Sequence, residues 1–262
     1  MSIKKLNILL SKSKYILSIV WFYRIFIKKN NKRLIDAINR IQINNNSLLS
    51  LIDDNDILID IGSHGGSWSF YLSKLVPKGK VICFEALPVY ANSLNILSFL
   101  TRKKNIDCYN YAIQDKVSKI RLTWLDQKGG RLTGMTRISV KADKKPQTLI
   151  VKGITLDSFF SDFEYENRII KFIKIDIEGA ELLALKGSIK IIKKFKPIII
   201  MEVCINHLKK YDIDIKSVYS FFDKIGYKAN STLQKLENFK YVSLENPEFN
   251  DDIIFIPKFV KF

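Results

Sequence analysis

The chain has 262 residues, of which 47% are hydrophobic, and its formal net charge is +17 at pH 7. This apolar content supports a large buried core, so a wholly disordered chain is excluded, and the length fits one large domain with or without an appendage. The three cysteines form no Cys-x-x-Cys pair and only two histidines are present, which excludes a disulfide framework and a His-rich zinc site. Unpaired cysteines favour a reducing compartment, so we expect a cytoplasmic protein.

The positive charge is carried mainly by lysine, since only eight of the 43 basic residues are arginines. Proteins that read base edges or grip phosphates favour arginine, whose planar fork donates two parallel hydrogen bonds. The lysines are also scattered along the chain. The charge therefore indicates a solvated surface with a mild attraction to anionic substrates or membranes, and it argues against sequence-specific binding of nucleic acid.

Residues 1–48 are predicted to form an N-terminal helical extension. Its most apolar stretch, YILSIVWFYRIFIKK, contains Arg24 and is shorter than the roughly 20 apolar residues of a membrane-spanning helix. One interpretation is a helix that packs on the main domain or on a second subunit. The other is a helix at a membrane surface, with Trp21, Phe22 and Tyr23 beside lysines that suit anionic head groups. The extension therefore predicts self-association or peripheral membrane contact.

From residue 49 to residue 262, strand-like and helix-like segments alternate, which predicts one α/β domain. The strands are expected at 56–62, 80–86, 106–113, 169–177, 196–203 and 251–257. The helices are expected at 66–76, 88–101, 179–195 and 215–227. A hairpin partner or added edge strand is expected at 119–125, followed by a long loop at 126–148. This alternation predicts a doubly wound, mostly parallel sheet, whose ligand lies beyond the carboxyl ends of the strands.

The first predicted strand ends at Asp60 and leads into the glycine turn GSHGG, which would let the backbone approach a ligand closely. The turn has neither the Gly-Lys-Ser/Thr of a Walker loop nor the G-x-G-x-x-G spacing of a dinucleotide site. The Asp60 carboxylate would also repel a pyrophosphate, whereas it suits a ligand that carries positive charge. S-adenosylmethionine, with its sulfonium and ammonium groups, is such a ligand.

Glu85 ends the second predicted strand, 25 residues after Asp60. A carboxylate at this point of a doubly wound sheet typically accepts hydrogen bonds from ribose hydroxyls. The two acids and the glycine turn on successive strands together predict a site for S-adenosylmethionine.

Several segments occur in the order and spacing of the FkbM-type family of S-adenosylmethionine-dependent methyltransferases, which the chain therefore resembles. They are DIGSHGGSWSF, VICFEALP, YNYAI, ITLDSFF, FIKIDIEGAELLALKG, IIIMEV and a closing GY and IIFIP, and the most specific is KIDIEGAE. The resemblance covers residues 50–257. It implies a class I, Rossmann-like fold and methyl transfer to oxygen, often to a hydroxyl of a sugar or natural product. The chain departs from the family pattern at His64, where Asn is usual, and at Gly65, where an aliphatic residue is common.

The resemblance also implies which residues contact S-adenosylmethionine. They are Asp60, Gly62, Ser63, His64, Gly66, Trp68, Ser69, Glu85, Ala86, Ala112 and Asp176.

The fourth predicted strand ends at Asp176, which should lie beside the transferable methyl group, and Glu178 follows in the turn, where it would contact the acceptor. This position lacks the Asn/Asp-Pro-Pro-aromatic motif of many amine-directed methyltransferases, which argues against a nucleobase amine as acceptor. A neutral hydroxyl needs a base to take its proton as the bond forms. Asp176 and His207 are the candidate bases, and Glu202, at the end of the fifth strand, could orient His207 or Lys174.

No required metal is predicted. Glu202, Asp176 and Glu181 could nevertheless form an all-oxygen cation site, because carboxylates at neighbouring strand ends are suitable ligands for a hard cation.

Arg137 lies in the loop predicted at 126–148, a glycine- and lysine-rich stretch between two strand signals. Long loops on α/β scaffolds commonly contact substrates. Arg137 could pair with a phosphate or carboxylate of the acceptor, and a plain surface loop is the alternative.

The sequence as a whole predicts an S-adenosylmethionine-dependent O-methyltransferase that acts on a sugar hydroxyl in a glycan, polysaccharide or glycolipid precursor. One alternative is an RNA methyltransferase, favoured by the charge and disfavoured by the low arginine content. The other is a catalytically silent Rossmann-like binding subunit, which the presence of Asp60, Glu85 and Asp176 argues against.

Overall fold

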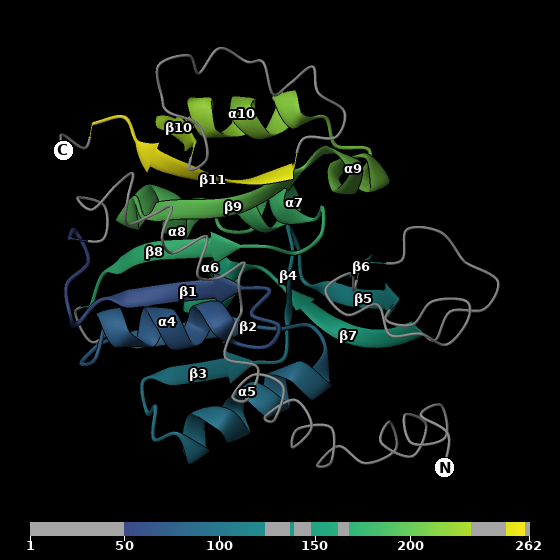
Figure 1. Ribbon diagram of the computed structural model, residues 1–262. Helices are drawn as coiled ribbons and strands as arrows, with labels where there is room; N and C mark the ends of the chain where they lie inside the picture. Colours follow the sequence, from purple (N-terminus) through teal and green to yellow (C-terminus); the bar gives the residue numbers. More distant parts are fainter. Residues whose placement is uncertain (1–49, 124–136, 139–147, 162–167, 232–249, 260–262) are drawn as a thin grey trace.

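The computed structural model describes residues 50–123, 137–138, 148–161, 168–231 and 250–259 (Figure 1). The predicted N-terminal extension and most of the loop predicted at 126–148 lie outside these residues. Within them, no helix combines the length and the apolar character needed to cross a membrane.

A mostly parallel central sheet forms the centre of the described domain. Its strands are β1 (Ile57–Ile61), β2 (Lys80–Phe84), β3 (Ile106–Tyr109), β8 (Ile170–Ile175), β9 (Ile198–Cys204), β10 (Tyr227–Ser231) and β11 (Asn250–Pro257). They lie in the order β10-β11-β9-β8-β1-β2-β3. Strands β3, β2, β1, β8 and β9 run parallel, whereas β11 is antiparallel to β9 and β10 to β11. The prediction of a doubly wound, mostly parallel sheet is confirmed.

Helices cover both faces of this sheet, because its central strands are apolar on both sides. One face carries α4 (Ser67–Leu75) and α5 (Pro88–Leu100), and the other carries α6 (Leu156–Ser161), α7 (Glu181–Lys186), α8 (Ile189–Phe195) and α10 (Ile215–Lys224). Alternate residues of β1 feed the two cores: Leu58 packs with Leu72 of α4, and Ile59 packs in the core of the opposite face. The alternation fixes which strand residues face each helical layer.

A second, smaller sheet stands beyond the carboxyl edge of the first (Figure 1). It contains β4 (Ala112–Ile113), β5 (Ser118–Thr123), β6 (Arg137–Ile138) and β7 (Thr148–Ile154), in the order β4-β7-β5-β6. The hairpin partner expected at 119–125 is β5, which pairs antiparallel with β7. Neither β7 nor β10 was among the predicted strands.

The single third strand predicted at 106–113 is wrong, because the chain leaves the central sheet at Asn110 and continues as β4 in the second sheet. The side-chain amide of Asn110 donates to the backbone oxygens of Glu85 and Ala86, both at 2.8 Å, and the Tyr111 amide donates back to the Tyr109 oxygen. These bonds turn the chain. The apolar pattern continues across the turn, so the pattern alone does not reveal it.

The single helix predicted at 179–195 is also wrong, since α7 ends at Lys186 and α8 begins at Ile189. Gly187 lies between them, against the backbone that follows β4. A Cβ atom at Gly187 would lie 1.9 Å from the Gln114 carbonyl oxygen. The break therefore lets the chain pass close to the second sheet and brings α8 onto the central one.

Replacing Gly187 by alanine should lower the free energy of unfolding by about 1–3 kcal/mol, because the backbone must shift to relieve the contact with Gln114. Urea denaturation measures the change. Lys186→Ala, an exposed neighbouring position, should stay within about 0.5 kcal/mol of the wild type. A Gly187→Ala protein as stable as Lys186→Ala would show that the close approach is not required.

Candidate active site at the carboxyl edge of the sheet

The glycine turn connects β1 to α4 and is held by the neighbouring strand ends. The Gly62 amide donates to the Phe84 oxygen at 2.9 Å, and the Asp176 amide donates to the Ile61 oxygen at 3.0 Å. Gly62 has a φ of +80°, and a Cβ atom there would lie 1.9 Å from the Asp176 carbonyl oxygen. Glycine is therefore required at this position, because both the left-handed backbone and the close approach exclude a side chain.

Asp60 lies beneath this turn and is fully buried. Its Oδ2 atom accepts a hydrogen bond from the Ser69 hydroxyl at 2.6 Å, and Lys174 Nζ lies 3.7 Å from its Oδ1 atom. Burial raises the pKa of Asp60, whereas Lys174 and Ser69 oppose the rise. Asp60 thus lies behind the turn, and its influence on a ligand would be electrostatic.

Lys174 links Asp60 to the more exposed Asp176. The Lys174 side chain is 5% exposed, its Nζ atom lies 3.2 Å from Asp176 Oδ2, and it donates to the Gly62 oxygen at 3.4 Å. Burial lowers the pKa of Lys174, but the carboxylates of Asp176 and Asp60 outweigh burial and raise it. Two carboxylates and one ammonium leave a net negative charge at this point. The Asp176 side chain is 38% exposed, so it is the member of the group that can reach a ligand.

Glu85 follows β2 and joins the glycine turn to the loop that begins α5. Its Oε2 atom accepts from the His64 amide and its Oε1 atom from the Leu87 amide, both at 2.8 Å. Burial raises the pKa of Glu85 to about 7, and the Leu87 and His64 amides moderate the rise. Each carboxylate oxygen can accept a further hydrogen bond, so the side chain can hold the turn and still bind a hydroxyl.

His64 adopts a left-handed backbone with a φ of 45°, and its ring centroid lies 4.5 Å from that of Tyr90. Burial, followed by the charge of Lys174, lowers the pKa of His64 to about 4. The imidazole is therefore neutral at pH 7. The family that the chain resembles usually has Asn at this position. Asn and His are both enriched among residues with a left-handed backbone, so either fits the turn.

The other predicted cofactor residues lie around the same strand ends. Ser63 and Ser69 are buried, Gly66 precedes α4 with a φ of +80°, and Ala112 is buried in β4. Trp68 and Ala86 are partly exposed. The fold brings all of them to one edge, whereas their contact with a cofactor stays a prediction. Asn110, which holds the backbone after Glu85, was missed by the sequence reasoning, although the segment YNYAI contains it.

The turn after β8 accounts for the rest of the motif KIDIEGAE. Glu178 and Gly179 both have a positive φ, of 59° and 110°. Glu181 is buried, and its Oε1 atom accepts from the amides of Ile177 and Gly179, both at 3.0 Å. Glu181 therefore stabilises the turn. The all-oxygen cation site considered for Glu202, Asp176 and Glu181 is wrong, because Glu181 points back into its own turn.

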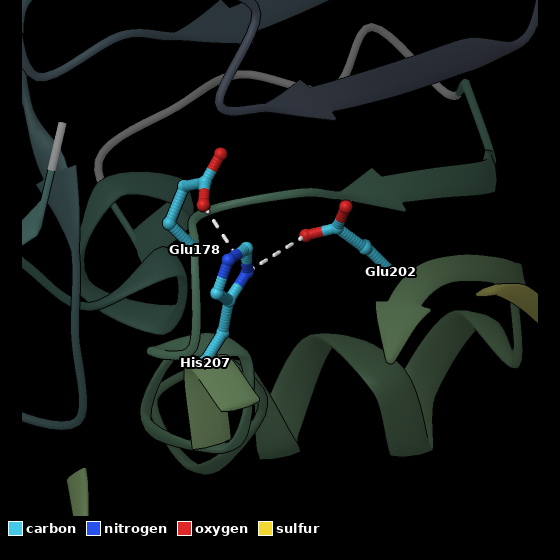
Figure 2. Close-up of side chains that lie close together, drawn as sticks. All are labelled: Glu178, Glu202 and His207. Atoms are coloured by element: carbon cyan, nitrogen blue, oxygen red, sulfur yellow. Dashed lines mark ion pairs between the residues drawn. The ribbon is translucent and has the colours of Figure 1, made fainter. Parts of the chain in front are cut away.

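Glu178, Glu202 and His207 instead form a cluster, the Glu-Glu-His cluster (Figure 2). Glu178 comes from the turn after β8, Glu202 from β9, and His207 from α9 (Ile205–Leu208). His207 Nδ1 lies 3.1 Å from Glu178 Oε2 and 3.4 Å from Glu202 Oε2. Two arrangements were predicted for Glu202, one beside His207 and one beside Lys174. The structure has Glu202 beside His207.

Charge within the cluster changes the pKa values of its members. Glu202 raises the pKa of His207, burial opposes the rise, and Glu178 adds to it. Burial and then Glu202 raise the pKa of Glu178 to about 7. Both carboxylates thus favour the imidazolium form of His207. Whether Asp176 or His207 acts as a base stays a prediction.

Arg137, the other predicted acceptor residue, lies in β6, and its backbone pairs with Thr123 of β5. The glycine-rich part of the loop before it lies outside the described residues. Contact between Arg137 and an acceptor stays a prediction.

A basic cavity of about 590 Å³ lies at the opposite edge of the central sheet, near the amino ends of β2, β3 and β8. Its basic residues are Lys74, Lys78, Lys80, Arg102, Lys103, Lys104 and Arg168. Two of these charges are paired, since Lys78 lies 2.7 Å from Asp54 and Lys80 lies 2.7 Å from Asp107. Ligands of doubly wound sheets bind at the carboxyl edge, so this cavity is not the candidate active site.

Comparison with known proteins identifies the family of the chain. A family model described as "Methyltransferase FkbM domain" matches residues 60–229, more than half of the chain. Among curated protein sequences, none matches the chain with significance.

Similar folds occur among solved structures. A methyltransferase FkbM from Methylobacillus flagellatus KT is 16% identical, with a TM-score of 0.49, over 78% of this chain and 44% of that one. The chain therefore spans less than half the length of that protein. A Streptococcus mutans protein assigned as a methyltransferase and solved with SAH is 12% identical over 82% and 96% of the two chains, with a TM-score of 0.47. An rRNA methylase from Streptococcus thermophilus is 11% identical over 83% and 95%, with a TM-score of 0.45.

Proposed function

Because the chain belongs to the FkbM methyltransferase family and has the class I, Rossmann-like fold, we propose that it transfers a methyl group from S-adenosylmethionine to a hydroxyl oxygen. The observation that carries the proposal is the polar edge formed by the glycine turn, Glu85 and Asp176. Glu85 follows β2 and the partly exposed Asp176 follows β8, and these strands flank β1, which leads into the glycine turn.

S-adenosylmethionine would lie across this edge, with its ribose at Glu85 and its methionine end near Asp176. A ribose suits Glu85 because two neighbouring hydroxyls can donate to one carboxylate. The sulfonium suits the other end, because Asp60, Lys174 and Asp176 carry a net negative charge there. His64 adds no opposing charge, since its lowered pKa keeps it neutral at pH 7.

The affinity for S-adenosylhomocysteine should rise with pH between 6 and 8. The pKa of Glu85 is raised to about 7 in the empty site, and ribose hydroxyls donate best to the ionised carboxylate, so a proton must leave as the ligand binds. The affinity then falls up to tenfold for each pH unit below the pKa of Glu85. It should therefore be about tenfold weaker at pH 6 than at pH 8. Calorimetric titration at several pH values measures it.

Glu85→Gln is the control, since it keeps the shape and removes the titrating group. Its affinity should vary little over the same pH range, and far-UV circular dichroism confirms that it folds. If the pH dependence persists in Glu85→Gln, Glu85 is not the ribose acceptor.

The transfer step would use Asp176 as the base. The acceptor oxygen attacks the methyl carbon, the carbon–sulfur bond breaks, and its electron pair stays on sulfur to give the neutral thioether. The acceptor's proton passes to the Asp176 carboxylate as the new carbon–oxygen bond forms. The sulfonium is a good leaving group, so the main task of the protein is to align oxygen and methyl group.

The acceptor class that we propose is a sugar hydroxyl in a glycan, polysaccharide or glycolipid precursor. The absence of an Asn/Asp-Pro-Pro-aromatic sequence after β8 supports an oxygen rather than an amine acceptor. RNA is the second candidate, and the basic cavity at the opposite edge is the observation that favours it.

Transfer of labelled methyl groups separates the two candidates. The protein is incubated with methyl-labelled S-adenosylmethionine and either a polysaccharide fraction or an RNA fraction from the same cells. We expect label in the polysaccharide fraction, with its incorporation unchanged by Lys103→Ala in the basic cavity. Label confined to RNA would overturn the sugar assignment but keep methyl transfer. Label in neither fraction, together with an absence of S-adenosylhomocysteine binding, would overturn the proposed function.

A further inference from the structure

We infer that Glu178, Glu202 and His207 form a binding site for one divalent transition-metal ion. This departs from the prediction that no metal is required. The inference rests on the spacing, shielding and anchoring of the three side chains, and it needs no cofactor or acceptor to be tested.

The spacing of the ligand atoms fits a coordination sphere. Metal–ligand bonds of about 2.1 Å place neighbouring ligand atoms about 3.0 Å apart in octahedral and about 3.4 Å apart in tetrahedral geometry. His207 Nδ1 lies 3.1 Å from Glu178 Oε2 and 3.4 Å from Glu202 Oε2. One atom from each of the three side chains can be chosen so that all lie within 4.8 Å of one another. Small rotations of the carboxylates would therefore suffice to bind an ion.

Two of these atoms are shielded from solvent without a compensating hydrogen bond. Glu202 Oε2 and His207 Nδ1 are both inaccessible, and neither makes a hydrogen bond of good geometry to another described residue. The two atoms face one another at 3.4 Å as an ion pair, and for buried ion pairs the cost of desolvation can exceed the gain from their attraction. A cation between the side chains would satisfy both atoms at once.

The backbone holds the two segments of the site together. A Cβ atom at Gly179 would lie 2.4 Å from the His207 carbonyl oxygen, so the turn after β8 and helix α9 touch through their main chains. Glu178 directly precedes Gly179, and its left-handed backbone, with a φ of 59°, turns its side chain toward the histidine (Figure 2). The ligands are thus largely preorganised, which lowers the cost of binding.

The ligand types indicate the kind of ion. Imidazole nitrogen favours transition metals such as Zn²⁺ and Mn²⁺ over Mg²⁺ and Ca²⁺, which prefer oxygen ligands only. Two carboxylates balance the charge of a divalent ion. The positive charge of Lys210, which lowers the pKa of both Glu178 and His207, reduces the attraction of the cluster for a cation. We therefore expect Zn²⁺ or Mn²⁺ to bind more tightly than Mg²⁺.

The position of the site gives the ion a role that rests on the proposed function. Ile175 pairs with Met201 in the sheet, so Asp176 and Glu202 are the next residues of adjacent strands. Three protein ligands leave coordination positions open. Hydroxyl oxygens of the acceptor could occupy these positions, beside the proposed base.

The experiment is a titration of the full-length, tag-free, chelator-treated protein with Mn²⁺, in which electron paramagnetic resonance measures the free ion. We expect one bound equivalent, displaced by Zn²⁺ and poorly by Mg²⁺. Loss of residues that merely support metal ligands costs 10–100-fold in affinity, so Glu178→Gln, Glu202→Gln and His207→Gln should each weaken binding at least about tenfold. Lys210→Ala should strengthen it.

Asp115→Asn, which changes an exposed carboxylate elsewhere, is the matched control and should bind Mn²⁺ as the wild type does. Circular dichroism verifies that every variant is folded. The inference is overturned if the wild type shows no saturable binding of Mn²⁺ or Zn²⁺, or if all three ligand variants bind as tightly as Asp115→Asn. Because S-adenosylmethionine and acceptor are absent, either result leaves methyl transfer to be tested separately.

Discussion

Replacing Asp176 by asparagine should lower kcat by about 10²-fold or more, which is the usual contribution of a general base. The substitution keeps the shape of a side chain that is 38% exposed at the end of β8, and it removes the charge that would accept the proton. Affinity for S-adenosylhomocysteine should change by less than about threefold, because its neutral thioether lacks the sulfonium charge that Asp176 would attract and its ribose keeps Glu85. Single-turnover rates at saturating cofactor and acceptor measure the effect.

His207→Ala is the comparison, since His207 is the competing base. Its rate should fall by less than about tenfold, because Glu178 and Glu202 surround Nδ1 and favour the protonated ring. A near-normal rate for Asp176→Asn would remove Asp176 from catalysis. A larger loss in His207→Ala than in Asp176→Asn, with all proteins chelator-treated so that no metal ion contributes, would assign the base to His207.

Replacing Lys174 by methionine should lower the free energy of unfolding by about 3–5 kcal/mol, the cost of leaving a buried charge without its partner. Lys174 is the cation beside Asp60, which is fully buried, and it also contacts Asp176 at 3.2 Å. Methionine fills much of the same volume, so the loss would come from the charge rather than from a cavity. Urea denaturation at pH 7 measures it.

The double variant Asp60→Asn/Lys174→Met shows whether the uncompensated charge is the cause. Removing both charges should recover much of the loss, as buried ion pairs replaced as a pair often do. The explanation is contradicted if the free energy of unfolding of Lys174→Met lies within about 1 kcal/mol of the wild-type value. It is also contradicted if the double variant is no more stable than Lys174→Met.

Strands β1, β2 and β8 could be predicted because each is a short apolar run that is followed directly by a glycine or an acid. Parallel strands covered on both faces need such runs, and their carboxyl ends must meet at one edge. This reasoning placed Asp60, Glu85 and Asp176 together. It did not distinguish Asp60, whose side chain lies beneath the turn, from Asp176, whose side chain is accessible, because that difference depends on the position of Lys174 in the adjacent strand.

The parts that were missed depend on single backbone turns. Asn110 ends β3 through side-chain hydrogen bonds, and Gly187 divides α7 from α8 through one close contact, yet neither interrupts the apolar pattern. The Glu-Glu-His cluster was predicted only in part. Glu202 was expected beside His207 or Lys174, whereas Glu178 was expected at the acceptor, because a left-handed residue reverses the direction expected from strand alternation and turns Glu178 toward His207.

The chemical position of the transferred methyl group tests the central claim most directly. The wild-type protein and Asp176→Asn are each incubated with S-adenosylmethionine carrying a ¹³C-labelled methyl group and with the polysaccharide fraction. Carbon NMR of the purified product then distinguishes a methyl group on oxygen from one on nitrogen or carbon. The account predicts an O-methyl signal with the wild type that is greatly reduced with Asp176→Asn. A methyl signal on nitrogen, or equal O-methyl signals from both proteins, would contradict it.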